Sequence, residues 1–517
     1  MKHSYGGEVI VDFELQHNLV NCYESVLDTT ICQEETQEAI VPDACPDILR
    51  ILDARAYACL TGKQIRDNLI TVTGLIRTSV FYLPEGEAGV RHLEIATPFT
   101  CQTDAHGVSN QGMVLAFPAV RWAEARALNP RKILLRVDLS VGIKALQTSQ
   151  MDFCCAALSE SSVGLRQLFS NETIDIISDV QEKPFTFSDT VDFSALNNSH
   201  GEVLNIHGTP CCHESRLIGN KLIFKGTVEL DVLLCVGSEL KAVRQSMPYS
   251  QIMEIPGVGD NCSCEVRVAL ADLSFQPDDN FANSGMITLE LLAQAIVLEN
   301  CSITLLSDLY STSFLMETRA EAHTLNRFLE QNIKTTPVRE LLETTTMVRT
   351  VAHGWADLGE LHAVREGDQS TITVQVQLNV IYQDDAEQFQ SVHKTIPVCC
   401  TVDCPVGGKH QCWCAAPTEL FISPAAGGLE IRFSQDFHCI TSQTYQTTAI
   451  VSAELGDERS KSDESQPSII LRLAAPGERL WDIAKYYATT EEEIIQANEL
   501  ESDVLPIGKM LLIPRAR

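Results

Sequence analysis

Residues 471–514 read LRLAAPGERLWDIAKYYATTEEEIIQANELESDVLPIGKMLLIP, and this stretch carries the most consistent local signals in the chain. It opens on an apolar strand at 469–473, which the turn-forming pair Pro476-Gly477 ends. Four apolar residues then recur at i, i+3, i+4 and i+7 and predict one buried face of a helix: Leu480, Ile483, Ala484 and Tyr487.

A second helix is predicted to begin at Thr490, because Thr490 and Glu493 have the spacing of a capping box. The three glutamates at 491–493 would also meet the positive end of the helix dipole. A turn at 506–509 then leads into a last short strand. The predicted order is therefore strand, helix, helix, strand.

That order, with PGERLWDIA at 476–484 and IGKMLLIP at 507–514, resembles a LysM module over nearly all of 471–514. The resemblance implies a shallow groove between the loop after the first strand and the loop before the second, which many members use to bind N-acetylglucosamine polymers. Carried over to this chain, the groove would be lined by Pro476, Gly477, Glu478 and Arg479 on one side and by Leu505, Pro506 and Ile507 on the other. Trp481 matches a position that is mostly core in the family, so we expect a packed aromatic there rather than a ligand contact.

The 517 residues are too many for one hydrophobic core and predict about three to five domains. A formal net charge of −31 argues against nucleic acid or an anionic membrane surface as a partner, because phosphates would be repelled. The sequence shows no apolar run behind Lys2 and no apolar stretch of about 18 residues. We therefore expect a cytoplasmic protein without a signal peptide or a transmembrane segment.

In a reducing compartment, the 19 irregularly spaced cysteines predict thiols rather than a disulfide framework. The densest group could ligate zinc, although its spacing fits no paired-knuckle pattern: Cys399, Cys400, Cys404, Cys412 and Cys414, with His410 among them. Because cysteine is frequent throughout the chain, we favour buried thiols over a metal site, and we expect no metal and no cofactor.

Upstream of the C-terminal stretch, three landmarks recur in the same order at a spacing of about one domain length. A long alternating strand stands at 68–82, 220–234 and 371–382. A proline-centred triplet follows as Thr97-Pro98-Phe99, Met247-Pro248-Tyr249 and Ile396-Pro397-Val398, and a second strand pattern stands at 133–143, 286–297 and 429–439. Chance similarity would not keep this register, so we predict three copies of one β-rich, sandwich-like domain, at 1–150, 151–302 and 303–453.

An acidic, polar run at 454–468 has almost nothing to bury and predicts a flexible linker to the LysM domain at 469–517. Three short segments are predicted to be helical. One follows Pro46 over 47–52, because proline is tolerated at a helix start. The other two, 164–169 and 321–333, lie near the copy boundaries. The acids of the first segment, Asp43 and Asp47, fit a turn and a helix start better than a cation site.

The triplicated domain, with VPD at 41–43, PDILRIL at 46–52 and VTG at 72–74, resembles the SPOCS domain of spore-coat-associated proteins. The first copy matches best, because the other two lack the Pro-Asp-Ile segment and the third has Val374 in place of the glycine. Several SPOCS repeats that end in LysM resemble the SipL-type spore morphogenetic proteins. This resemblance implies a mother-cell protein at the forespore surface that binds the ATPase of the coat basement layer, with LysM as a main contact.

The sequence contains no Walker loop, no Gly-x-Ser-x-Gly elbow and no His-Glu-x-x-His motif. Lone histidines such as His207 and His353 are expected to be structural or solvated. The leading hypothesis is a non-enzymatic scaffold and adaptor of endospore coat assembly, whose LysM groove is turned to a protein because cytosol holds no polymeric peptidoglycan. The alternative is a protein that binds peptidoglycan glycan chains of the cortex. A LysM-targeted hydrolase is the third reading, although no carboxylate pair is singled out.

Overall fold

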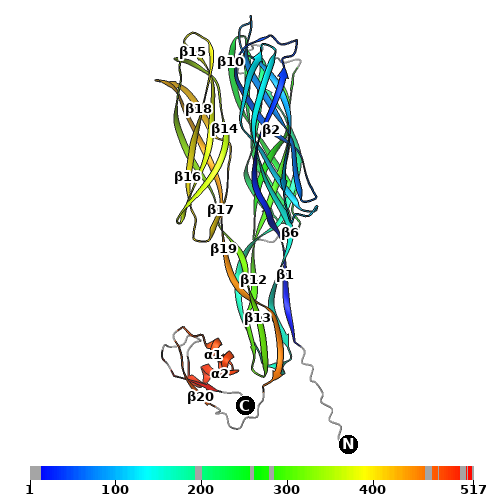
Figure 1. Cartoon of the computed structure of the whole chain (residues 1–517), viewed down its shortest axis with the longest axis vertical. Helices are drawn as coiled ribbons and strands as arrows, with labels where there is room; N and C mark the ends of the chain where they lie inside the picture. Colours follow the sequence, from blue (N-terminus) through cyan, green and yellow to red (C-terminus); the bar gives the residue numbers. More distant parts are fainter. Residues whose placement is uncertain are drawn as a thin grey trace.

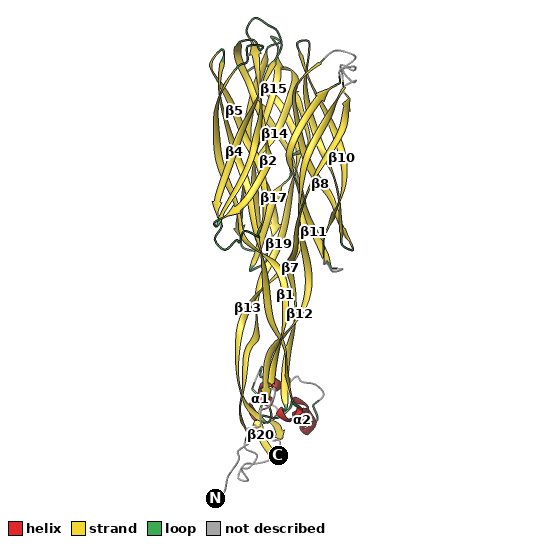
Figure 2. Ribbon diagram, turned by 90° about the vertical axis from the view of Figure 1, so that its right-hand side faces the viewer, coloured by secondary structure: helices red, strands yellow, loops and turns green. Residues whose placement is uncertain are grey.

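The computed structural model describes residues 13–192, 201–256, 261–278, 284–459, 469–475, 477–500, 508 and 510–514. Within them the chain is almost entirely β-strand, and two short helices stand near the C-terminal end (Figure 2). The prediction of a mainly β protein that ends in a small α+β module is therefore confirmed.

The strands before residue 459 form three sets with one order. Repeat 1 comprises β1 (Phe13–Ile40), β2 (Ile48–Arg66), β3 (Leu69–Pro84), β4 (Arg91–Asp104), β5 (Met113–Asn129) and β6 (Lys132–Ser159). Repeat 2 comprises β7 (Leu165–Asp192), β8 (Gly201–Ile218), β9 (Lys221–Val236), β10 (Glu239–Glu254), β11 (Cys262–Pro277) and β12 (Ser284–Ser311). Repeat 3 comprises β13 (Phe314–Glu343), β14 (Val348–Glu366), β15 (Gln369–Asp384), β16 (Phe389–Asp403), β17 (Gly408–Cys414), β18 (Thr418–Ala425) and β19 (Gly428–Glu458).

Each repeat has two β-layers. One layer is a three-stranded antiparallel sheet whose middle strand is β3, β9 or β15. The other layer holds the first and last strands of the repeat, with β5, β11 or the pair β17 and β18 beside the last strand. Buried side chains of β3 and β6 meet in one hydrophobic cluster, and those of β15 and β19 meet in another. Alternating apolar residues thus bury the inner face of each layer, as in a sandwich.

The proline landmarks occupy one structural position in all three repeats. Pro98 pairs with Leu75, Pro248 with Thr227 and Pro397 with Gln375, always from the outer strand to the middle strand of the three-stranded sheet. An outer strand tolerates proline because the missing N–H can point away from the ladder. The proline therefore recurs at the same structural position because the three repeats share one strand topology.

The first and last strands of each repeat are much longer than the sandwich requires. They run for 28 to 31 residues. At about 3.3 Å per residue they extend to about 90–100 Å. Their lower halves continue as three two-stranded ribbons that wind around one another below the sandwiches (Figure 1). We call this part the stalk. Its core takes side chains from all three ribbons, including Phe153, Ile174, Ile303, Leu325 and Ala449.

The predicted domain boundaries at 150/151, 302/303 and 453/454 fall inside β6, β12 and β19. The chain instead passes between repeats at the lower end of the stalk, through a short 3-10 turn at Ser161–Val163 and a bend at 312–313. We call this end the foot. Residues 454–458, expected to begin the flexible linker, pair with β13, so that expectation is wrong for them. Residues 460–468 lie outside the described part of the chain.

The three predicted helices are also wrong. Residues 48–52 begin β2, 165–169 begin β7 and 321–333 belong to β13. Short apolar runs fit either element, and here pairing along the whole of a long neighbouring strand satisfies the backbone hydrogen bonds. Asp43 and Asp47, which precede β2, pair with an arginine and do not cap a helix. Arg131 donates to Asp47 at 2.9 Å and to Asp43 at 3.1 Å, and also to the carbonyl oxygens of Cys45 and Val41.

A glycine–aromatic pair explains why Val374 can replace glycine in repeat 3. A Cβ at Gly74 would lie 2.3 Å from both the Phe99 ring and the Cys59 carbonyl oxygen, and one at Gly226 would lie 2.4 Å from the Tyr249 hydroxyl and 1.9 Å from the Cys211 carbonyl oxygen. In repeat 3 the corresponding pair is Val374 and Val398, so a smaller partner accompanies the larger residue. The two positions share one space, which the carbonyl oxygen of the neighbouring strand also limits in repeats 1 and 2.

We therefore expect Gly74→Val alone to lower the free energy of unfolding by about 1–3 kcal/mol or more, because the added side chain overpacks the site. Adding Phe99→Val should recover part of this loss, because the double variant reproduces the pair found in repeat 3. Denaturant unfolding of the two single variants and the double variant measures the coupling. Strictly additive losses would contradict the shared-space explanation.

All three repeats contribute to one buried polar junction between the sandwiches. Arg55 of repeat 1 donates to Asp231 of repeat 2 at 2.8 Å, and its Nη1 lies 3.2 Å from Nε2 of His353 in repeat 3. Asp357 accepts from the Trp355 indole and from Asn379, each at 3.1 Å. Beside this group lies an apolar cluster that also draws on all three repeats. The repeats therefore share an interior and form one body.

Candidate functional site

The C-terminal module has the predicted order. It comprises β20 (Ile469–Leu473), α1 (Leu480–Tyr487), α2 (Glu491–Asn498) and β21 (Met510–Pro514), with β20 antiparallel to β21. The predicted apolar face of α1 packs against β21, where Leu511 and Ile513 are fully buried. The capping box is present: the Glu493 amide donates to the Thr490 hydroxyl at 3.1 Å, and the Thr490 amide donates to the Glu493 carboxylate at 3.3 Å.

Asn498 joins the second helix to the last strand. Its Nδ2 donates to the Leu512 carbonyl at 2.6 Å, and its Oδ1 accepts from the Leu512 amide at 2.7 Å. A side-chain amide is suited to this role because it offers a donor and an acceptor side by side. The contact of Asn498 with Leu512 was not predicted from the sequence, because a hydrogen bond to a distant strand leaves no local signal.

Only one wall of the predicted groove lies within the described residues. Gly477 adopts a left-handed φ of 78° and has open space around its Cα, while Glu478 and Arg479 follow it into the start of α1. Glu478 forms an ion pair with Arg472 and accepts from the Ala475 amide. Arg479 forms two hydrogen bonds with Asp482, at 2.8 and 2.9 Å, which lower the pKa of Asp482.

The charges of this wall are thus balanced inside the module. Arg479 stays well exposed despite its pairing, so its guanidinium remains available to a polar ligand. Pro476 and the residues expected to form the opposite wall lie outside the described residues: Leu505, Pro506 and Ile507. The complete groove therefore stays a prediction.

The module docks on the foot of the stalk through the face of α1 that carries Trp481 and Lys485, which are one turn apart. Trp481 is buried as expected, but its indole also donates to Asp308 at 2.8 Å, and Lys485 donates to the same carboxylate at 2.6 Å. The Tyr310 ring lies 4.9 Å from the Trp481 ring, and its hydroxyl donates to the Thr489 carbonyl at 2.9 Å. In this structure the module is docked on the body, which the prediction of a flexibly tethered module did not anticipate.

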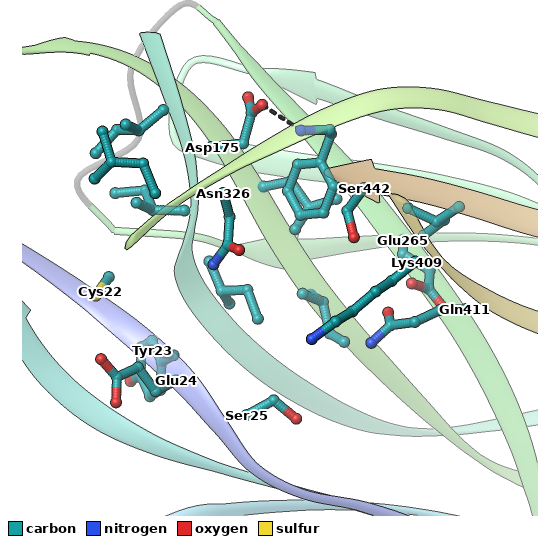
Figure 3. Close-up of a pocket in the computed structure, with 18 of the residues that line it drawn as sticks. Cys22, Tyr23, Glu24, Ser25, Asp175, Glu265, Asn326, Lys409, Gln411 and Ser442 are labelled. Atoms are coloured by element: carbon teal, nitrogen blue, oxygen red, sulfur yellow. Dashed lines mark hydrogen bonds between the residues drawn. The ribbon is translucent and has the colours of Figure 1, made fainter. Parts of the chain in front are cut away.

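A cavity of about 450 Å³ lies where the sandwiches meet the stalk (Figure 3). All three repeats line it, with apolar residues such as Ile174 and Leu325 beside the charged residues Glu24, Glu265 and Lys409. Lys409 extends into the space, and Lys144, which also lines it, is paired with Asp28 at 3.7 Å. Burial raises the pKa of Glu265. The lining mixes both charges and contains no nucleophile hydrogen-bonded to a base.

The predicted cysteine group is only partly brought together. Cys412 and Cys439 face each other across β17 and β19, with their Sγ atoms 3.4 Å apart. Burial raises the pKa of Cys414 to about 12, so this thiol stays protonated at neutral pH. His410 turns instead to the Thr441 hydroxyl at 3.0 Å. Among the described residues, no three histidine, cysteine or acidic side chains are arranged to hold a metal ion.

The described helices are all too short or too polar to cross a membrane.

Comparison with known families finds two matches. The model of the SipL SPOCS domain matches residues 201–278, which is the β8–β11 part of repeat 2. The model of the LysM domain matches residues 475–514. No curated protein matches the chain. The SPOCS match lies in the second copy, whereas sequence reasoning expected the first to resemble the family best.

Proposed function

From the premise that this chain is of the SipL type, with a SPOCS domain and a C-terminal LysM domain, we propose that it is a non-enzymatic scaffold and adaptor of endospore coat assembly. The two domains indicate a sporulation-related protein that carries a binding module of the peptidoglycan-binding type. The proposed place of action is the mother-cell side of the forespore surface.

The observation that carries this proposal is the position of the LysM module. It lies at the foot, with the stalk between it and the sandwiches (Figure 1). The three repeats bury a shared interior and long paired strands, which suits a rigid spacer. A rigid spacer with a binding module at one end can hold two assemblies at a set distance. We propose that the module binds the morphogenetic ATPase of the coat basement layer.

A deletion of 469–517 tests the adaptor role. The full chain should retain the purified ATPase in a pulldown, and the truncated chain should lose it while keeping the β-type circular dichroism spectrum. Because deletion also uncovers Tyr310, Arg479→Glu provides a second variant that changes only the exposed wall of the groove. Arg319→Glu, which alters an equally exposed arginine of the stalk, is its matched control. Undiminished ATPase binding by the truncated chain would refute the assignment.

The second candidate is a peptidoglycan-binding protein of the cortex, and the LysM match itself favours it. A parallel pulldown on purified peptidoglycan separates the two functions. Strong retention on glycan that Arg479→Glu abolishes, with no retention of the ATPase, would favour this candidate. Zymography on peptidoglycan gels checks for hydrolysis, and we expect no clearing.

A further inference from the structure

Asp308 is the main charged group in the contact between the LysM module and the foot, to which Arg166 and Glu492 add an exposed ion pair at 3.6 Å. Asp308 accepts from the indole of Trp481 and from the ammonium of Lys485, and its Oδ1 also accepts from the Leu309 amide at 2.9 Å. Hydrogen bonds from a charged donor to a partly buried carboxylate are about twice as strong as neutral ones. Tyr310 adds an edge-to-face ring contact with Trp481, at an interplanar angle of 70°.

A β-bulge aims Asp308 at the module. The register between β12 and β7 shifts between Leu306 and Asp308. Such a bulge leaves an unpaired residue and turns the strand, which re-aims the side chains beside it. The ribbons of repeats 1 and 3 have register shifts at the corresponding level, between Gln16 and His17 and between Arg319 and Ala320. All three ribbons therefore have similar backbones here.

Only repeat 2 combines this bulge with the side chains that the module contacts. The residue after the bulge is Ala156 in repeat 1, Asp308 in repeat 2 and Ser452 in repeat 3. Two positions further on stand Leu158, Tyr310 and Glu454. At these two positions, repeat 2 alone among the three ribbons offers a carboxylate together with an aromatic ring. This difference between otherwise similar ribbons distinguishes a specific docking surface from a chance contact.

We propose that the foot of repeat 2 is a docking surface for the chain's own LysM module, and that Asp308 is the latch that holds α1 on it. In the latched state Trp481 and Tyr310 are covered, with 5% and 3% of their surface exposed, while Arg479 and Gly477 at the groove wall remain open. A groove ligand can bind the latched module. A partner that needs the Trp481 face must first displace the stalk. This inference does not depend on what the groove binds.

The connection to the body permits both states. Arg459 is anchored at the foot, where its amide donates to the Ser313 carbonyl at 2.8 Å and its side chain donates to the Phe314 carbonyl at 3.0 Å. Nine residues, 460–468, then separate it from β20. A segment of this length can span up to about 30 Å. The module could therefore leave the foot without disturbing β19.

Hydroxyl-radical footprinting of the full chain, read by mass spectrometry, tests the latch. Asp308→Ala should weaken docking by about 10- to 100-fold, because it removes a charged hydrogen-bond acceptor. The oxidation rates of Trp481 and Tyr310 should rise together. Asp308→Asn should have an intermediate effect, since it keeps an acceptor for the indole but loses the charge that faces Lys485. Asp152→Ala removes an exposed stalk carboxylate, and it should change neither rate.

Residues that stay buried in both states report on folding. Leu511 and Ile513 of the module and Trp355 of the polar junction should remain protected in every variant. Tyr310→Ala, which leaves the module sequence intact, should also expose Trp481. Equal oxidation of Trp481 in the natural chain and in both variants would overturn the latch. Loss of protection at Leu511 and Ile513 in both Asp308→Ala and Tyr310→Ala would also overturn the latch, because the foot would then be part of the module's core.

Discussion

Arg55→Met is expected to lower the free energy of unfolding of the three-repeat body by about 3–5 kcal/mol, the usual cost of removing one partner from a buried ion pair. Arg55 is 6% exposed and donates to Asp231 at 2.8 Å. Its guanidinium also lies 5.4 Å from the centre of the Trp355 ring. Methionine fills similar space but leaves the Asp231 carboxylate buried opposite an apolar side chain.

The expected loss is large because the buried Asp231 carboxylate depends on nearby positive groups to stay ionised. Burial alone would raise the pKa of Asp231, but Arg55, His353 and Arg244 together lower it to about 2, and Arg55 is the largest of these three causes. Without it, Asp231 must remain buried with less compensation or take up a proton. Arg55, Asp231 and His353 come from three different repeats, so the loss should loosen the junction rather than one sandwich.

Denaturant unfolding of the full chain measures the effect. Arg126→Met, which removes an exposed arginine from a surface pair with Glu124, is the matched control and should cost about 0–1 kcal/mol. The double variant Arg55→Met with Asp231→Leu should lose less than Arg55→Met alone, because no charge is then left unpaired. A loss below about 1 kcal/mol for Arg55→Met would show that water reaches the junction and screens it.

Replacing Asp53 and Asp357 by asparagine is expected to stabilise the protein at pH 8. Burial raises the pKa of each carboxyl to about 7 from its ordinary value of 3.8. Because the folded pKa lies above the unfolded one, both groups stay protonated in the fold between pH 4 and 7 while the unfolded chain ionises. Stability therefore falls as pH rises through this window, by about 1.4 kcal/mol per unit for each group.

Two histidines of the same junction act in the opposite direction. Burial lowers the pKa of His207 to about 3 and that of His353 to about 4. Below pH 6.5 the unfolded chain protonates these rings and the fold does not, so their contribution to stability rises with pH up to about 6.5. Between pH 4 and 6.5, the contributions of Asp53 and Asp357 to stability fall with pH while those of His207 and His353 rise. The four contributions therefore nearly cancel. The natural chain should show little pH dependence from the junction in that range.

The double variant Asp53→Asn with Asp357→Asn removes the two contributions to stability that fall as pH rises, and it leaves those of the two histidines. Its stability should rise from pH 4 to 6.5, and at pH 8 it should exceed that of the natural chain by up to about 4 kcal/mol for each site. Asp231 also faces this region, and because its pKa is lowered to about 2 it keeps its charge above pH 4 and does not create the slope. Chemical denaturation at pH 4, 6 and 8 checks the curve. Identical pH dependence of the two proteins would refute the assignment.

The C-terminal module was predictable almost in full because its signals are local. The capping box at Thr490 and Glu493 and the helical spacing of Leu480 and Ile483 act within one or two turns of chain, and both are confirmed. The recurrence of Pro98, Pro248 and Pro397 was equally visible, because an outer strand tolerates proline at a fixed point of the repeated register. Mainly β structure and a LysM end followed from these patterns.

The positions of the strand ends were not predictable, because nothing local distinguishes the stalk from the sandwiches. The same alternation continues through β1, β6 and β13 whether a layer of its own repeat or a neighbouring ribbon covers it. By sequence alone, a short apolar run such as Ile48 to Leu52 is compatible with a helix. In the structure its backbone hydrogen bonds are made with the neighbouring strand β3 instead.

The amino-acid sequence by itself determined the β character of the body, its threefold recurrence and the small module at the end, since propensity, period and capping act between near neighbours. Tertiary structure alone decided that Arg55, Asp231 and His353 share one interior, and that Asp308 receives Trp481. These contacts join residues 122 to 298 positions apart. Burial makes them strong by removing water, and burial is created only when the whole chain has folded.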